Sequence, residues 1–185
     1  MSLVSDNAAT HRSPPPTLAH VLDALYQVCI WAAGIAIALM SLVVPVGVFM
    51  RYVLGVGARW PEPIAILLMV VFSFLGAAAA YRAGAHIAVD LFTQRLAARW
   101  RPMLARLVDT LMLLVCGFVL WFGARLSLQT MGQSISELPW LAVGVTYAPI
   151  PIGAAFTLAF VIERMVWGPQ LHRAVVRIGD AEKAA

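Results

Sequence analysis

The chain has 185 residues, of which 62% are hydrophobic and 12% are charged, and its formal net charge is +4. A water-soluble domain carries about twice that share of charged residues because its surface must be polar, so the composition excludes an ordinary soluble fold. Lipid is therefore the expected solvent for most of the chain. The basic residues flank apolar runs and form no clustered patch, which argues against nucleic-acid binding.

The chain starts with a polar, proline-rich stretch that lacks the apolar core of a signal peptide. We expect residues 1–16 to form a disordered cytoplasmic tail. The first apolar run contains no charged residue over residues 24–50. We expect it to stay in the protein as a membrane anchor. A bilayer core needs about 20 such residues as helix, so a membrane span is predicted over about residues 24–49. Thr17 is the expected helix cap, and Pro45 is expected to kink the helix.

A second apolar run predicts a membrane span over about residues 63–81. It follows a short loop in which Gly55 allows a turn and Trp60 suits the membrane interface. Residues 76–80, in the last turns of this span, have almost no side chains. Small residues let helix backbones approach closely in lipid, so this end of the span is expected to pack against other helices.

The densest charge of the chain lies in its middle, where the second span leaves the membrane. Gly84 is expected to end that helix, and a shorter amphipathic helix is predicted over about residues 87–100. Its apolar residues recur at helical spacing on one side, with long arginines beside them that reach headgroup phosphates. Such a helix would lie in the membrane interface and act as a brace, through Val89, Phe92, Leu96, Arg99 and Trp100.

Two further apolar runs predict membrane spans over about residues 103–124 and 145–167. Near the start of the third span, Arg106 and Asp109 are three residues apart and are expected to pair on one face of the helix. A polar loop separates these two spans. A basic cytoplasmic tail, residues 169–185, follows the fourth span.

The distribution of basic residues supports a four-span membrane domain over residues 17–168. With four spans, both termini and the middle loop share one side, which then holds ten Arg and Lys residues. The other side holds three, namely Arg51, Arg59 and Arg125. By the positive-inside rule both termini are cytoplasmic. The predicted fold is an all-α membrane protein with four transmembrane helices and an amphipathic interfacial helix between the second and third.

The sequence contains no motif for catalysis or cofactor binding. HExxH, GxSxG, phosphate-loop and GxGxxG patterns are absent, and the charge-free runs hold no carboxylate. The four histidines lie in tails, loops or helix ends, and not at mid-membrane, where haem ligands would face each other. The two cysteines lie in apolar runs, where small buried side chains are expected. We therefore expect no enzyme activity, no metal site and no cofactor.

Three classes of function stay open at this point. One is a scaffold whose helices bind another membrane protein. A four-helix redox anchor is the second, and a haem absorbance band would identify it. The third is a small stand-alone carrier, which would need polar groups near the midplane of broken helices. The apolar runs offer few such groups: Ser41, Ser73 and Thr157.

A set of short motifs lies between residues 51 and 92, and one more opens the last span: Arg51-Tyr52, Trp60 with Glu62, Phe74-Leu75-Gly76-Ala77, Arg82 with Gly84, His86-Ile87, Val89-Asp90 and Pro151-Ile152-Gly153. With these motifs, residues 51–92 resemble the signature region of the small membrane subunit of TRAP transporters, the tripartite ATP-independent periplasmic transporters of DctQ type. A later stretch, residues 134–153, also resembles the family, and the resemblance extends over about residues 20–168. The family often has two adjacent acids after the tryptophan, where this chain has Glu62 followed by Pro63.

The resemblance implies a transporter of three parts in the bacterial inner membrane. A periplasmic binding protein delivers an organic acid, a large permease subunit moves it with Na⁺ and without ATP, and the small subunit scaffolds the large one. It implies no catalytic, substrate-binding or metal-binding residue in this subunit. Its partners would be the large permease, the binding protein and membrane lipids, but not nucleic acid. Candidates for family-specific or partner contacts are Arg51, Glu62, Gly76, Arg82, His86 and Asp90.

Overall fold

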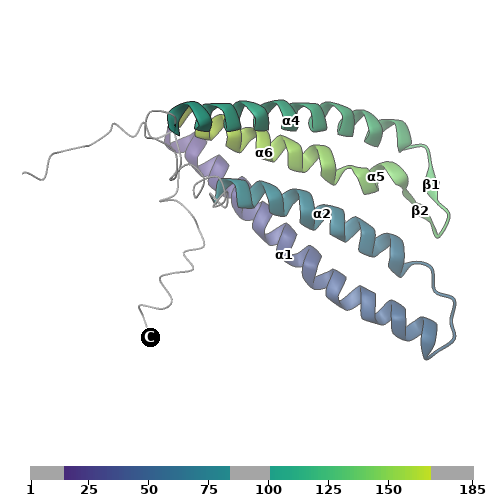
Figure 1. The fold of residues 1–185 in the computed structure, drawn as a ribbon. Coiled ribbons are helices and arrows are strands. Elements are labelled where there is room, and N and C mark those ends of the chain that lie inside the picture. The colour runs from purple at the N-terminus through teal and green to yellow at the C-terminus, as the bar shows by residue number, and fades with distance from the viewer. Residues whose placement is uncertain (1–14, 84–100, 168–185) are drawn as a thin grey trace, which may run out of the picture.

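A computed structural model describes residues 15–83 and 101–167 of the chain (Figure 1). Four stretches of helix are long and apolar enough to cross a membrane, which confirms the predicted all-α fold with four spans. The interfacial helix predicted over residues 87–100 lies outside the described residues. The elements are α1 (Pro16–Tyr52), α2 (Pro61–Arg82), α4 (Arg101–Thr130), β1 (Ser134–Ile135), β2 (Leu138–Ala142), α5 (Val143–Tyr147) and α6 (Pro149–Trp167).

Prolines mark the beginning of three of the long helices. α1 begins at Pro16, α2 at Pro61 and α6 at Pro149. Proline is tolerated in the first turn because the missing N–H would have no partner inside the helix. In α1 the cap position is Pro15, and no side chain caps the helix. The sequence placed the cap at Thr17, which was wrong, because the fixed φ of Pro16 already suits the first helical turn.

The four long helices pack in an order that differs from their order along the chain. α1 packs mainly on α2, α2 also packs on α6, and α6 packs on α4. The spatial order is therefore α1, α2, α6, α4, with α2 and α6 in the middle (Figure 1). α4 and α6 are joined by the short β1–β2 hairpin, in which Ile135 pairs with Leu138, and by α5.

The helices converge at one end of the molecule and spread toward the other (Figure 1). The end with Pro16, Arg82 and Trp167 is called the closed end here. The opposite end, with Tyr52, Pro61 and the β1–β2 hairpin, is called the open end. The central cluster of buried side chains lies toward the closed end: Leu22, Tyr26, Cys29, Ala78, Ala79, Tyr81, Phe160 and Val161.

Glycines allow the closest helix contacts. A Cβ atom added at Gly153 of α6 would lie 2.6 Å from the Cβ of Phe74 on α2. A Cβ atom added at Gly144 of α5 would likewise lie less than 3 Å from atoms of Ser127 and Met131 on α4. The Gly144 carbonyl also accepts a 2.7 Å hydrogen bond from the Ser127 hydroxyl. In lipid the hydrophobic effect does not drive helices together, because lipid tails are as apolar as the side chains. Close packing at small residues takes its place as a source of helix association.

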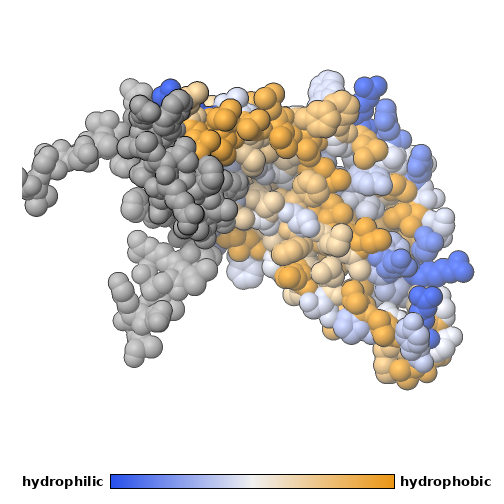
Figure 2. All heavy atoms as spheres, viewed as in Figure 1, coloured by the Kyte–Doolittle hydropathy of each residue, from blue (hydrophilic) through white to orange (hydrophobic). Residues whose placement is uncertain are grey.

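Most of the apolar side chains of the membrane spans point outward. In the most apolar window of each span, between 11% and 33% of the residues are buried inside the chain. Figure 2 shows hydrophobic residues over the length of the helices, and hydrophilic residues gathered along the edge at the open end. Such a surface suits a lipid environment or another membrane protein, and it is far larger than a soluble monomer exposes.

Candidate functional site

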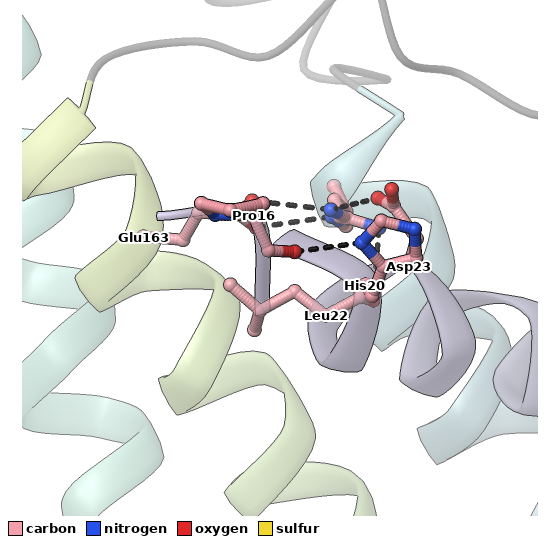
Figure 3. A network of polar contacts seen from close by, with 6 residues as sticks. Pro16, His20, Leu22, Asp23 and Glu163 are labelled. Atoms are coloured by element: carbon pink, nitrogen blue, oxygen red, sulfur yellow. Dashed lines mark hydrogen bonds and ion pairs between the residues drawn. The ribbon is translucent and has the colours of Figure 1, made fainter. Parts of the chain in front are cut away.

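A cluster of buried and half-buried charged side chains lies at the closed end and centres on Arg82, the last residue of α2. Its side chain is only 7% exposed. The guanidinium donates two hydrogen bonds to Glu163 of α6, from Nε to Oε2 at 3.0 Å and from Nη2 to Oε1 at 3.1 Å. It donates two more to α1, to Oδ1 of Asp23 at 2.6 Å and to the carbonyl oxygen of Leu22 at 2.9 Å (Figure 3). Arg82 therefore links three helices.

The surroundings of Arg82 explain why this position holds arginine. The planar guanidinium binds both oxygens of Glu163, and only arginine has enough donors to bind α1 as well. The rings of Tyr26 and Phe160 each lie with their centroid 5.3 Å from its central carbon, and they supply apolar contact and cation–π attraction. The Glu163 side chain is 3% exposed, so its negative charge depends on this partner.

A second pair of charges lies beside the first and connects α4 to α6. Nε of Arg164 lies 3.4 Å from Oδ1 of Asp109, and the hydroxyl of Tyr81 donates to the same oxygen at 3.3 Å. The sequence predicted that Asp109 would pair with Arg106 on its own helix. That prediction was wrong, because Asp109 is buried and faces α6 and α2 while Arg106 is exposed.

The two groups of contacts form one closed-end cluster that ties together all four long helices. Tyr81 and Arg82 are neighbours in α2, and Glu163 and Arg164 are neighbours in α6. Each of these dipeptides sends one side chain toward the Arg82 group and the other toward the Asp109 group. The members of the closed-end cluster are Asp23, Tyr81, Arg82, Asp109, Glu163 and Arg164.

The other predicted site residues do not join this cluster. Arg51 is exposed in the last turn of α1, and Glu62 is exposed in the first turn of α2, both at the open end. Gly76 lies in α2, where an added Cβ would be 3.8 Å from that of Ala33 on α1. The remaining candidates lie outside the described residues: His86, Asp90, Val89, Phe92, Leu96, Arg99 and Trp100.

The carboxylate partners of Arg82 lie far from it along the sequence, at separations of 59 and 81 residues. Sequence reasoning did not identify Asp23 and Glu163 as those partners. A usable signal was present, because the predicted topology places these two acids and Arg82 at the same membrane boundary. Charges at one depth, each beside apolar residues, are candidates for mutual pairing.

The cluster has the chemistry of a structural contact. Each nitrogen of Arg82 donates to a group of the chain itself, and these contacts use four of the five N–H groups of the guanidinium. Over residues 15–83 and 101–167, no group of three His, Cys, Asp or Glu side chains is arranged to hold a metal ion. The closed-end cluster thus links the four long helices to one another.

Two grooves flank Glu62 at the open end. One, of about 540 Å³, lies between the second half of α1 and the first half of α2. The other, of about 380 Å³, lies between α2 and the segment that carries the hairpin and α5. Glu62 lines both grooves, Arg51 lines the first, and Glu137 lines the second. The open end therefore combines apolar furrows with charges at their edges.

The chain is similar to known proteins of one transporter family. The family model for the DctQ component of the tripartite ATP-independent periplasmic transporters matches residues 40–168. A relative from Haemophilus influenzae, named "Putative TRAP transporter small permease protein", is 28% identical over 151 residues, which cover 81% of this chain and 91% of the relative. With its four membrane-spanning helices, the chain therefore belongs to the DctQ family of TRAP transporter small permease components, which are transporter subunits and not enzymes.

Proposed function

We propose that this chain is the scaffold subunit of a TRAP transporter, which holds the large permease subunit in the bilayer while that subunit carries out transport. The transporter would take up an organic acid that a periplasmic binding protein delivers, driven by Na⁺. The Na⁺ coupling and the class of substrate follow from the family resemblance. The scaffold role has support from the chain itself.

The observation that carries the proposal is the contrast between outward apolar surface and inward polar contacts. Large side chains along the spans face outward, including Trp121, which is 69% exposed, and Phe118 beside it on the next turn. The buried charges of the closed-end cluster are paired with one another. A carrier needs polar groups free to bind its substrate near mid-membrane, whereas a scaffold needs apolar surface free to bind another protein.

The proposed orientation places both termini and the closed end on the cytoplasmic side of the bacterial inner membrane. The basis is the excess of basic residues in the termini and the middle segment. The open end, with Glu62 and the hairpin, would then face the periplasm, where the binding protein arrives. The amphipathic segment 87–100 would brace the assembly in the cytoplasmic interface.

Co-expression with the large permease and the binding protein tests this proposal. A tag on the small subunit is expected to retain the large subunit during purification in mild detergent. Vesicles that contain both subunits should accumulate the organic acid when Na⁺ and the binding protein are present outside. Vesicles that contain this chain alone should accumulate none. Uptake by this chain alone, or failure of the two subunits to co-purify, would contradict the scaffold role.

A matched pair of surface variants sharpens the test. Leu114 and Phe118 lie on the outward face of α4, and Leu42 and Ile35 lie outward on α1. Replacing each pair by alanine removes apolar contact without adding charge. If one helix face binds the large subunit, one double variant should lower the yield of complex while the other does not. Equal yields for both variants and the parent chain would argue against docking through either face.

A further inference from the structure

The groove between α1 and α2 at the open end has an apolar floor within the membrane spans. Its volume is about 540 Å³. It opens beside the point where Gly47 and Pro61 bring the two helices into contact, since a Cβ at Gly47 would lie 2.7 Å from that of Pro61. Beyond Ala36, no residue of α1 is buried, so the part of the chain that the structure describes leaves this furrow uncovered. The apolar side chains of its lining are Met40, Val44, Val48, Ile66 and Met69.

Two side chains of opposite charge stand at the polar end of this groove. Arg51 lies in the last turn of α1, Glu62 lies in the first turn of α2, and both line the groove. Both are exposed. Within residues 15–83 and 101–167, neither makes a side-chain hydrogen bond or an ion pair, in contrast to the paired charges of the closed end. A cation and an anion are thus available together where an apolar furrow meets the membrane surface.

We propose that this groove binds one phospholipid with a zwitterionic headgroup that carries a primary ammonium, of the phosphatidylethanolamine type. An acyl chain lies along the apolar floor, the phosphate accepts hydrogen bonds from Arg51, and the ammonium donates to Glu62. The charge pattern selects this occupant. An anionic headgroup without a cation would leave Glu62 unpaired beside a second negative charge, and a quaternary ammonium has no N–H to donate.

The membrane itself makes a lipid the fitting occupant. A groove that opens sideways from two membrane spans faces acyl chains at high concentration, and each buried methylene adds favourable contact. Arginine suits phosphate because its planar fork can bind two oxygens at once. The bound lipid would fill the space between α1 and α2 and make the open end more rigid. The lipid proposal does not rest on the scaffold role, so lipid retention by the chain alone can fail while co-purification with the large subunit succeeds, and the reverse.

Native mass spectrometry of the full chain, released from nanodiscs of defined composition, tests the proposal. Nanodiscs with the same acyl chains but ethanolamine, choline or glycerol headgroups are compared. The ethanolamine lipid is expected to be retained about fivefold to tenfold more than the other two, the size expected for the net contribution of one hydrogen bond at an exposed site. Equal retention of all three headgroups would overturn the proposed selectivity and the site with it.

Variants separate the two ends of the proposed contact. Arg51→Gln should lower the retention of every phospholipid, whereas Glu62→Gln should abolish the preference for ethanolamine over both choline and glycerol headgroups. Arg125→Gln is the matched control, because Arg125 is an exposed arginine of α4 that lines neither groove. The proposal is overturned if the control loses as much lipid as Arg51→Gln does, or if Arg51→Gln loses none.

A groove-filling variant and a crosslinking experiment test whether lipid occupies the apolar floor of the groove between α1 and α2. Ala65 lines the groove, and Ala65→Phe should block lipid retention while thermal unfolding of the purified chain shows that it still folds. A photoreactive residue in place of Met69 should crosslink to lipid in the assembled complex. A crosslink to the large permease instead would show that a protein side chain fills the groove, and would overturn the proposal.

Discussion

The closed and open ends of this molecule are held together by different forces. At the closed end, Arg82 links α1, α2 and α6 through four hydrogen bonds, and aromatic rings cover it. At the open end, α1 has no buried residue after Ala36, and the charges Arg51 and Glu62 stand without partners in the described chain. One end is complete within the chain, and the other leaves its surface available to lipid or protein.

This difference shows how a four-helix membrane subunit can be both stable and incomplete. Lipid gives no hydrophobic drive for helices to associate, so polar links and small-residue contacts must define where they meet. Here the ion pairs lie at the closed end, whereas close glycine contacts also occur along α6 and toward the open end, at Gly153, Gly144 and Gly47. The helices can then spread at the open end without loss of the fold. Four changes test this view, in order from the largest expected effect to the smallest.

The largest effect is expected for Arg82→Met, which leaves the buried Glu163 carboxylate without its partner. Removal of one member of a buried ion pair costs about 3–5 kcal/mol in the free energy of unfolding. The midpoint of thermal unfolding in detergent, followed by tryptophan fluorescence, should fall sharply. Arg82→Lys should give an intermediate loss, because one ammonium cannot bind Glu163 through two oxygens and α1 as well.

The double variant Arg82→Met with Glu163→Gln should unfold at a higher temperature than Arg82→Met alone, because no unpaired charge remains buried. Arg125→Met, at an exposed arginine, is the control and should leave the midpoint almost unchanged. If Arg125→Met destabilised the chain as much as Arg82→Met, the closed-end cluster would have no special role.

The next effect is expected for Gly153→Ala, which tests the contact between α2 and α6. The added methyl group would lie 2.6 Å from the Cβ and 2.9 Å from backbone atoms of Phe74, so the helices must move apart. Overpacking of this kind costs about 1–3 kcal/mol. Gly117→Ala is the matched control, since a Cβ there meets nothing within 4 Å. The yield of monodisperse protein after heating should fall for the first variant only.

A smaller effect is expected for Asp109→Asn, which weakens the second ion pair of the closed end. Arg164 is 28% exposed and its Nε lies 3.4 Å from Asp109, so solvent can replace part of the interaction. A loss of about 1 kcal/mol in the free energy of unfolding is expected, well below that for Arg82→Met. A double-mutant cycle with Arg164→Gln measures the coupling. A coupling of zero would mean that the pair adds nothing to the link between α4 and α6.

The smallest effect is expected at the open end, for Gly55→Ala in the loop between α1 and α2. Gly55 has a φ of 64°, a left-handed conformation that costs other residues about 1 kcal/mol. The loop is exposed and can adjust, so unfolding should change little while local hydrogen exchange in the loop increases. Gly57→Ala, at a glycine of the same loop without positive φ, is the control. A larger effect at Gly57 than at Gly55 would contradict this reasoning.

The sequence predicted the helices better than their contacts. The apolar runs indicated four spans because the thickness of a bilayer sets the length of a helix, and lipid requires that its backbone bonds be internal. The pairing of Asp109 with Arg106 was wrong, because a spacing of three residues allows a local pair but does not reveal which neighbouring helix lies closer. The same limit hid Asp23 and Glu163 as partners of Arg82.

The sequence alone predicted four membrane-spanning helices, the family, and the side of the membrane on which each end lies. These depend on local properties: hydrophobic length, charge bias and short motifs. Tertiary structure alone decided that α2 and α6 lie in the middle and that Arg82 joins residues 59 and 81 positions away. It also decided that Arg51 and Glu62 line a groove without partners among the described residues. The reason is physical: a buried charge takes the partner that packing brings to it, and packing joins segments distant along the chain.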